Sequence, residues 1–429
     1  MLQKVATTGV DLDSVYAQTP ERIREQKGDR SRLGMEVLMW VSHAVRPLGI
    51  SELCHALAVE MESTDLGPEN IRPQDTVLGS CLGLAVVDAK TSTVRLIHYT
   101  LQEYLSWPGI LPDAHKTLGQ TCLTYLNHKE AKGLPAKSTS NLGDMPFLKY
   151  SSLYCGSHAK VELSGRAKLL ALELLDQGGN NISTTILVER IERYHSCSLP
   201  YHLWPSLHCA SYFGITEVVA ALIERGGCGI NHSDCIGFTP LIRAARQGNE
   251  GVMRLLLAQD DINPTSLIAL VKPHFGGLLA RDDINPDKPN NDSETSLWDA
   301  SCNGHEGVVK LLLARNDTNP NTPGNVGLTP LFLATAFGQE GVVKLLLARD
   351  NINPNHLSIF GQTPLSYASS EGNGGVVKLL LARNDIDPNS PDNEGLTPLL
   401  CASRNGHEGV VKLLLARDDV NPDIPDHYG

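Results

Sequence analysis

The C-terminal part of the sequence repeats one pattern at a fixed interval. From Thr295 onward, four copies follow the scheme T-P-L-x-x-A, then G-[HQN]-x-G-V-V-K-L-L-L-A-R, then N-P, with small departures. Their first residues, Thr295, Thr329, Thr363 and Thr397, are 34 positions apart. A period of this length is typical of stacked repeats, because one unit is a single supersecondary element that cannot bury its apolar side alone. The pattern therefore predicts a stack of similar units.

The residues of one unit predict two helices and a turn. Thr329 is suited to cap a helix, with Pro330 at the first helical position. Gly338 can end this inner helix with a positive φ, and the apolar run 342–347 predicts an outer helix that neighbouring units must cover. Asn-Pro at 353–354 breaks that helix, and the polar stretch that follows predicts a hairpin.

These motifs resemble the ankyrin repeat. The resemblance lies in T-P-L-x-x-A, in Gly-His at 304–305 and 406–407, and in V-V-K-L-L-L, all in register. One difference is consistent, since the family usually has Gly-Ala before the hairpin and this chain has Asn-Asp, Asp-Asp or once Asp-Asn. The resemblance implies that a protein partner binds the concave side of the array.

We expect the array to cover residues 201–429 with about seven units. The distance from Thr239 to Thr295 is 56, which is 34 plus 22. This spacing predicts an extra unit at 265–286 that has lost about twelve residues. Such a unit cannot present full faces to both neighbours, so we expect the coupling between units to be weakest there.

Residues 32–112 are expected to form a small winged-helix domain after an N-terminal helical arm at 1–31. Apolar residues at helical spacing predict a helix from Leu33 to Val45, and Ser51 is expected to cap a second one. A third helix is expected at 76–82. The β-rich runs 84–87 and 94–98, joined by a polar turn, predict a hairpin.

Residues 113–200 predict a helical linker, with helices at 122–126, 147–158, 167–175 and 186–194. The expected fold class is therefore mainly α, an ankyrin-repeat solenoid preceded by a small winged-helix domain and a helical linker.

A second resemblance concerns residues 95–105, which are similar to the segment that closes the winged-helix domain of NACHT-type signalling ATPases, the NOD-like receptors. The order of winged helix, helical linker and ankyrin array resembles the C-terminal half of fungal NACHT-ankyrin proteins. In that family the histidine that matches His98 senses the nucleotide phosphates. The sequence contains no G-x-x-x-x-G-K-[ST] loop, so we expect no nucleotide hydrolysis. The alternative for His98 is a structural residue that orients the next helix.

The charge and the cysteines limit the class of protein. The chain has 36 basic and 48 acidic residues, of which 16 and 26 lie in 201–429, so its charge argues against nucleic acid or an anionic membrane as the main partner. Ten scattered cysteines without a C-x-x-C pair indicate a reduced, intracellular protein. With no run of 18 apolar residues, we expect a cytoplasmic location.

Two patterns could carry chemistry, and both have a plainer explanation. Cys81 lies in a G-x-C-x-G stretch, but a nucleophile elbow needs a strand before the cysteine and a helix after it, and the expected order is the reverse. Zinc is suggested by the density of His195, Cys197, His202, His208 and Cys209, yet their spacings fit no common finger. We expect no catalytic residue, no metal and no cofactor.

Basic residues also recur every 34 positions on the outer helix, as Lys310, Lys344, Lys378 and Lys412 with Arg315, Arg349, Arg383 and Arg417. They could form a binding stripe. A solvated outer face is favoured, because each arginine lies at a helix C-terminus and is followed closely by Asp.

The recognition surface is predicted where the copies differ. The outer helix is nearly constant from copy to copy, whereas the end of the inner helix and the residue before the threonine change. We therefore expect partner contacts at Phe238, Arg246, Gln247, Glu294, Asn303, Leu328, Phe337, Gln362, Glu371, Leu396, Arg404 and Asn405.

The sequence thus favours a non-enzymatic protein-interaction module, the recognition half of a fungal NACHT-ankyrin type signalling protein. The alternative is a regulatory or adaptor subunit that docks through its winged helix on a separately encoded NTPase or hydrolase. A DNA-binding winged helix is disfavoured, because the expected third helix, 75–82, has no Lys or Arg.

Overall fold

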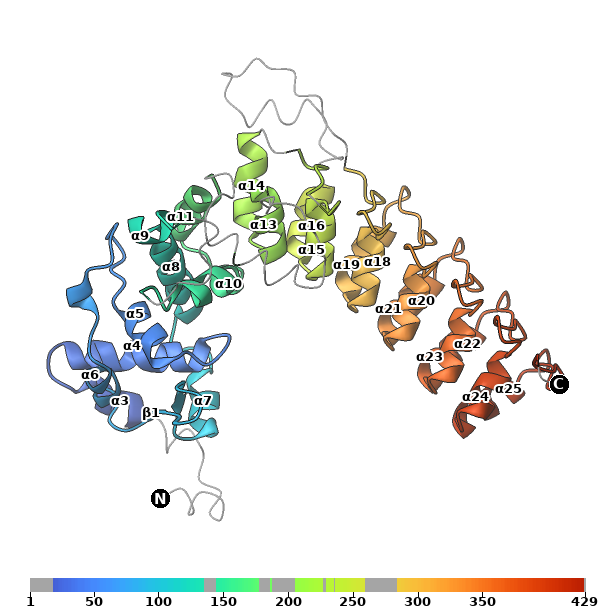
Figure 1. The fold of residues 1–429 in the computed structure, drawn as a ribbon, viewed down its shortest axis with the longest axis horizontal. Coiled ribbons are helices and arrows are strands. Elements are labelled where there is room, and N and C mark those ends of the chain that lie inside the picture. The colour runs from blue at the N-terminus through green and yellow to red at the C-terminus, as the bar shows by residue number, and fades with distance from the viewer. Residues whose placement is uncertain are drawn as a thin grey trace, which may run out of the picture. The chain divides into compact units, whose positions relative to one another are not determined.

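The computed structural model describes residues 18–134, 144–176, 186, 205–226, 229–234, 236–258 and 284–427. They belong to two compact units, Met1–Ser206 and Leu207–Gly429 (Figure 1). The described residues are mainly helical, as the sequence predicted.

The first unit begins with a winged helix. Its elements are α3 (Gln18–Arg24), α4 (Asp29–His43), α5 (Ile50–Leu57), the 3-10 helix η2 (Pro68–Asn70), α6 (Gln74–Gly79), β1 (Ala85–Val87), β2 (Val94–Leu96) and α7 (Tyr99–Leu105). The two strands pair antiparallel, with Val86 opposite Arg95. The predicted hairpin is confirmed, and an additional bridge joins Gly49 to Thr93.

The core of the winged helix draws on the helices and the wing together. It contains Ile23, Leu38, Leu96, Leu101, Tyr104 and Leu105. Ile23 comes from α3, so the described end of the predicted N-terminal arm packs into this core. One predicted cap is wrong, because Gly49 and not Ser51 is the N-cap of α5. Its amide donates to the Glu52 carboxylate at 2.8 Å, and that carboxylate also accepts two hydrogen bonds from Arg46.

The described part of the same unit continues with α8 (Ala114–Asn127), α9 (Lys129–Lys132), α10 (Leu148–Ala159) and α11 (Gly165–Asp176). Helices α8 and α10 pack on each other and α8 also contacts α4. Trp40 of α4 lies edge-on to Phe147 and Tyr150, with ring centroids 5.4 and 5.9 Å apart. The predicted helix 186–194 lies outside the described residues except for Ile186.

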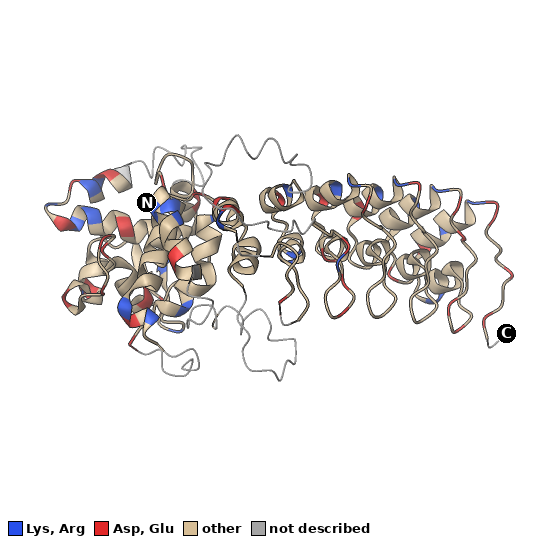
Figure 2. Ribbon diagram, turned by 90° about the horizontal axis from the view of Figure 1, so that it is seen from above, with Lys and Arg blue, Asp and Glu red and all other residues tan. Residues whose placement is uncertain are grey.

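The second unit consists of stacked helix pairs. The inner helices are α13 (Ser206–Phe213), α15 (Pro240–Arg246), α18 (Ser296–Cys302), α20 (Pro330–Ala336), α22 (Pro364–Ser370) and α24 (Pro398–Arg404). The outer helices are α14 (Thr216–Arg225), α16 (Glu250–Leu257), α19 (Glu306–Leu313), α21 (Glu340–Leu347), α23 (Gly374–Leu381) and α25 (Glu408–Leu415). Hairpins between the pairs form a row of loops along one side of the array (Figure 2).

The local chemistry of each unit follows the prediction. The Thr329 hydroxyl accepts a hydrogen bond from the Phe332 amide at 3.2 Å, and the threonines that start the other inner helices from α15 onward do the same. Gly338 has a φ of 66°, which lets the chain turn from α20 into α21. The apolar side of each outer helix is buried, as Val342, Val343, Leu346 and Leu347 are in α21.

The truncated unit predicted at 265–286 lies outside the described residues except for 284–286. The helix pairs on its two sides are immediate neighbours, since α15 packs on α18 and α16 on α19 (Figure 1). His305 Nε2 lies 3.1 Å from the Arg246 carbonyl, and Arg315 donates to the Leu257 carbonyl at 3.3 Å. Elsewhere in the stack His407 and Arg383 make the same kinds of contact. The described helix pairs on the two sides therefore contact each other directly, and the shortened unit with its weak coupling stays a prediction.

Candidate protein-recognition surface

Arginines at the ends of the outer helices join neighbouring units. In the Arg-x-Asp triplets that begin at Arg315, Arg383 and Arg417, the guanidinium makes two hydrogen bonds to the Asp two residues later. Its remaining nitrogen donates to a carbonyl of the preceding unit, such as Leu347 for Arg383 at 2.6 Å. These arginines are half-buried and fully engaged, so they are structural and do not form a binding stripe.

The lysines of the outer helices differ from these arginines. Lys310 and Lys412 are exposed and lie within ion-pair distance of Glu306 and Glu408, four residues earlier. Such exposed pairs contribute little to stability. The outer face is therefore solvated, as the sequence favoured.

Asparagines at the base of the hairpins form a second ladder between units. The Asn321 amide nitrogen donates to the Asn351 carbonyl at 2.7 Å, while its amide oxygen accepts from the Asn353 backbone at 2.7 Å. Asn355 and Asn389 repeat both contacts one and two units later. The asparagine that ends each Asn-Pro-Asn or Asp-Pro-Asn motif thus links one hairpin base to the next.

Asp287 occupies the same position in the ladder but lacks the amide donor. Its Oδ2 accepts from the Asn319 backbone at 2.7 Å, whereas Oδ1 is buried without a hydrogen-bond partner among the described residues. Burial raises the pKa of this carboxyl above its usual range.

Most of the residues predicted for recognition lie at the surface. Phe337 is 60% exposed at the end of α20. Five others are also exposed, namely Gln247, Asn303, Glu371, Arg404 and Asn405. Five are half-buried, namely Arg246, Glu294, Leu328, Gln362 and Leu396. Arg404 lies 3.4 Å from Glu394 of the preceding hairpin.

Phe238 is an error in the predicted set, because it is completely buried. The guanidinium carbon of Arg243 lies 4.3 Å from the centre of its ring, and that of Arg246 lies 5.4 Å away. Arg243 is itself buried and paired with the buried carboxylate of Asp234. Phe238 is thus part of an internal cation–π stack and cannot contact a partner directly.

Asp299 extends this buried polar cluster to the next unit. Its Oδ1 lies 3.7 Å from Arg246 Nε, and its Oδ2 has no hydrogen-bond partner among the described residues. Burial raises the pKa of the Asp299 carboxyl to about 7, although the arginine charges oppose the shift. The sequence pattern did not reveal this cluster, because Arg243 and Asp299 occupy positions that vary between copies.

The structure also exposes a group of apolar side chains that the sequence analysis missed. They lie in two adjacent hairpins and are Val326, which is 44% exposed, Leu357 (50%), Ile359 (57%) and Phe360 (64%). The signal was present in the sequence, since Ile359 stands where three other copies have Asn, and Phe360 where two of them have Asp or Glu.

His98 follows β2 by two residues and is the N-cap of α7. Its Nδ1 accepts a hydrogen bond from the Thr100 amide at 3.3 Å, and its ring stacks on Tyr99. These contacts fit the structural alternative, in which the histidine orients the helix that follows.

Three other histidines meet between α4, α8 and α10. His115 Nδ1 lies 3.0 Å from His158 Nδ1, and His43 stacks edge-on to His115. The Tyr150 hydroxyl lies 3.0 Å from His158 Nε2. Burial lowers the pKa of all three rings, that of His158 to about 3, so they are neutral near pH 7 and join the helices through hydrogen bonds.

The structure also locates Cys81 and part of the His and Cys group that the sequence singled out. Cys81 follows α6 and precedes β1, and burial raises the pKa of its thiol to about 11, which suits packing and not nucleophilic attack. His208 Nε2 lies 3.0 Å from the carbonyls of His232 and Phe238. His195, Cys197 and His202 lie outside the described residues. Within the described ranges, no group of three or more His, Cys, Asp or Glu residues could hold a metal ion.

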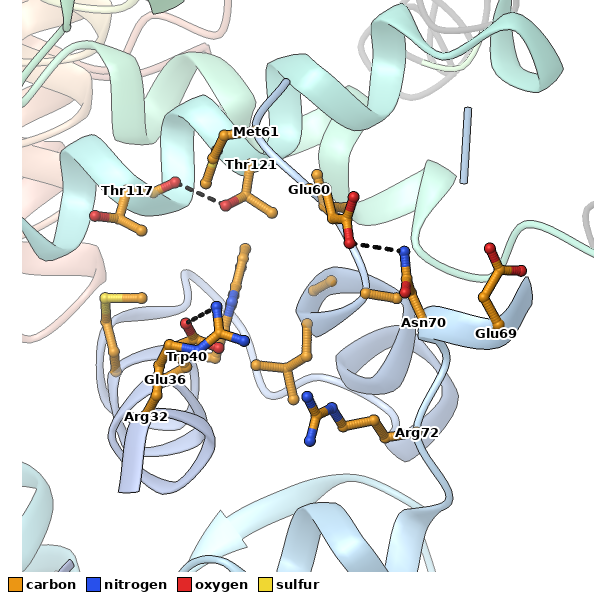
Figure 3. Close-up of a pocket in the computed structure, with 15 residues that line it drawn as sticks. Arg32, Glu36, Trp40, Glu60, Met61, Glu69, Asn70, Arg72, Thr117 and Thr121 are labelled. Carbon is orange, nitrogen blue, oxygen red and sulfur yellow. Dashed lines mark hydrogen bonds and ion pairs between the residues drawn. The ribbon is translucent and has the colours of Figure 1, made fainter. Parts of the chain in front are cut away.

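A cavity of about 570 Å³ opens between α4, the end of α5 and α8 (Figure 3). Met39, Trp40 and Met61 are among its apolar walls. Its polar groups contact one another or adjacent residues: Arg32 lies 3.9 Å from Glu36, Asn70 donates to Glu60, and Arg72 pairs with Asp29 at 3.0 Å.

Among the described residues, no helix is long and apolar enough to cross a membrane.

Comparisons with known proteins agree with both units. Residues 23–113 match the winged helix domain of GPI inositol-deacylase. Residues 177–266, 274–357 and 351–426 match ankyrin repeats in three copies. No curated protein matches the chain.

Solved structures show likeness to the array. One is the crystal structure of the ankyrin repeat domain of Bcl-3, a member of the IkappaB protein family. Its sequence is 21% identical to this chain, and the aligned region covers 52% of this chain and 89% of the Bcl-3 chain with a TM-score of 0.43. Another is an ankyrin repeat domain from Acinetobacter baumannii AYE, which is 23% identical. The aligned region covers 49% of this chain and 96% of that domain, with a TM-score of 0.40. The three repeat matches together span more than half of the 429 residues, and the chain belongs to the ankyrin-repeat family.

Proposed function

We propose that the array binds a protein partner through the exposed residues at the ends of its inner helices. The observation that carries the proposal is Phe337, a large aromatic side chain that is 60% exposed at a position that varies between copies, where others have Gln, Asn or Glu. Aromatic and arginine side chains dominate the energetics of protein interfaces, and Arg404 occupies the position beside it two units later. The proposed activity is binding without catalysis.

The test compares two matched sets of alanine variants. A partner is first identified by affinity purification with chemical crosslinking, and its affinity for each variant is measured by calorimetry. F337A or R404A should weaken binding by about 2 kcal/mol if the residue lies at a contact centre. K344A and K412A change exposed lysines of the outer helices and should leave binding unchanged. If the lysines prove essential and both inner-helix variants are silent, the proposed surface is wrong.

We further propose a cytoplasmic signalling context, in which this chain is the recognition half of a fungal NACHT-ankyrin type protein. Support comes from the order of a winged helix before ankyrin repeats. In that setting His98 would face a nucleotide only together with a NACHT domain. Sequencing the gene on the 5′ side of the Met1 codon tests this context, because the proposal requires an in-frame P-loop domain there.

A second candidate is an adaptor that docks through its winged helix on a separate NTPase or hydrolase. It is favoured by three apolar side chains that the wing and the start of α7 leave exposed, Val86, Ile97 and Tyr99. I97D should abolish capture of such an enzyme while F337A retains it. The opposite result would leave the array as the binding element.

A further inference from the structure

Two adjacent hairpins of the array carry an apolar surface that folding does not use. Val326, Leu357, Ile359 and Phe360, together called the hairpin patch, are all at least 44% exposed. We propose that the hairpin patch docks a partner segment that combines bulky apolar side chains with Lys or Arg. This inference rests on the proposed function as a protein-binding array, and it adds a place and a partner chemistry.

The four side chains belong to one surface. The Ile359 amide donates to the Val326 carbonyl at 3.4 Å, which joins the tips of the two hairpins. Gly327 has a φ of 74°, and a side chain built there would meet the Ile359 side chain at 3.6 Å. Leu357 and Ile359 alternate along the same segment, with Phe360 next in the chain.

The backbone under the patch is held in place before any partner arrives. The buried Ser358 hydroxyl accepts hydrogen bonds from the amides of Phe360 and Gln362, at 3.2 and 3.3 Å. The Phe360 carbonyl in turn accepts from the Asn393 amide of the next hairpin at 3.2 Å. A surface that is already ordered loses less conformational entropy on binding.

The neighbouring hairpins show that the apolar residues are not a requirement of the fold. At the positions of Ile359 and Phe360, three other hairpins have Asn291-Asp292, Asn325-Val326 and Asn393-Glu394, and one has Cys235-Ile236. The Asn393 side chain donates to the Ile359 carbonyl at 3.2 Å, so asparagine at this position links a hairpin to its neighbour. The Ile359 side chain cannot donate such a hydrogen bond, and it is an apolar group exposed to solvent. Exposed apolar groups that gather in one place mark interaction sites.

The charge around the patch selects the partner. The hairpins on either side carry Asp292, Glu294, Asp392 and Glu394, of which Glu394 pairs with Arg404, and the hairpin segment 355–362 has no Lys or Arg. A segment with cationic residues beside its apolar ones would be attracted to this rim, whereas a second copy of the chain would bring the same acidic rim and be repelled.

The neighbouring hairpin provides a conservative variant for the test. I359N/F360E installs the residue pair found at 393–394, so the fold is expected to survive, and circular dichroism and thermal unfolding check this. A random peptide library displayed on phage is selected against the purified full chain, and the enriched peptides are synthesised. Their affinities are then measured for the wild type, for I359N/F360E and for F337A.

The proposal expects enriched peptides that contain bulky apolar residues with Lys or Arg. Their affinity should fall at least about tenfold in I359N/F360E. F337A should not reduce it. Enrichment of acidic peptides, or affinities that I359N/F360E leaves unchanged, would overturn the proposal. If the peptides are instead lost in F337A, the array still binds protein and only the hairpin patch is refuted. A concentration-dependent dimer that I359N/F360E dissolves would identify a second copy as the occupant and also overturn it.

Discussion

Replacing Asp287 by asparagine should stabilise the array. At the equivalent positions, Asn321, Asn355 and Asn389 each donate an amide hydrogen to a backbone carbonyl 30 residues later, at 2.7 Å. The Asp287 carboxylate cannot donate, and its Oδ1 is left buried without a partner among the described residues. D287N keeps the oxygen that accepts from Asn319 and supplies the missing donor toward the Asp317 carbonyl.

The magnitude follows from the two changes that D287N makes. A typical added hydrogen bond contributes about 0.5–1.5 kcal/mol, and an unsatisfied buried polar atom costs about 1–3 kcal/mol. Because the side chain of Asp287 is only partly buried, we expect a total gain of about 1–2 kcal/mol in the free energy of unfolding. Equilibrium unfolding in urea at pH 7 measures this gain as a higher midpoint at unchanged slope.

The pH dependence gives a second measurement of the same effect. Burial raises the pKa of Asp287 in the folded state, so the folded state binds this proton more tightly than the unfolded state. The penalty is therefore present above the folded pKa and is relieved as the pH falls through it toward the ordinary value of 3.8. The advantage of D287N should shrink in acid.

A reverse variant provides the control. N321D removes a donor that is present and should destabilise the chain by a similar amount. The reasoning is refuted if D287N is neutral or destabilising at pH 7, or if N321D is harmless.

Three further predictions concern the same array. The Asp299 pKa of about 7 means that the folded state holds the proton more tightly than the unfolded state, so stability should rise as the pH falls from above 7 toward 3.8. Thermal unfolding measured across this pH range should show the rise. The D299N variant should show little dependence of stability on pH. Asn351 ends the triplet that begins at Arg349 and stands where the other triplets have Asp. N351D should therefore raise the free energy of unfolding, measured in urea, by up to about 1 kcal/mol, and N351A should not. Equal effects of the two variants would exclude a new ion pair as the cause. The direct contacts between the pairs α15/α16 and α18/α19 predict one cooperative transition for the array; hydrogen exchange that separates residues 206–257 from 296–415 into independently unfolding blocks would contradict it.

Local chemistry explains why much of the fold could be predicted. The threonine caps, the left-handed glycines such as Gly338 and the buried face of each outer helix depend on residues within one period, so the repeat reveals them directly. The wing hairpin was equally local, since alternating β-branched residues and a polar turn specify it. The cap of α5 was misplaced, because a backbone amide bound by Glu52 replaces the side-chain cap that Ser51 offered.

The features that the sequence did not predict depend on residues that vary between the copies or lie outside the repeated motif. The spacing of the threonines did not reveal that α16 and α19 contact each other directly. The burial of Phe238 depends on Arg243 and Asp234, neither of which belongs to the repeated pattern. The hairpin patch does not follow from the repeat, because the stretch before Gly361 is polar in most copies and Leu357, Ile359 and Phe360 depart from that pattern.

The neighbouring positions of α16 and α19 also have a practical consequence. Leu257 and Ile284 are separated by 26 residues in the sequence, yet the helices on either side pack as they would without that segment. The contacts of α15 with α18 and of α16 with α19 therefore fix the register of the stack at this point. A fluorescent protein or an affinity tag placed in this segment should leave both the array and its exposed hairpins available, which makes the segment a suitable attachment point for reporters of partner binding.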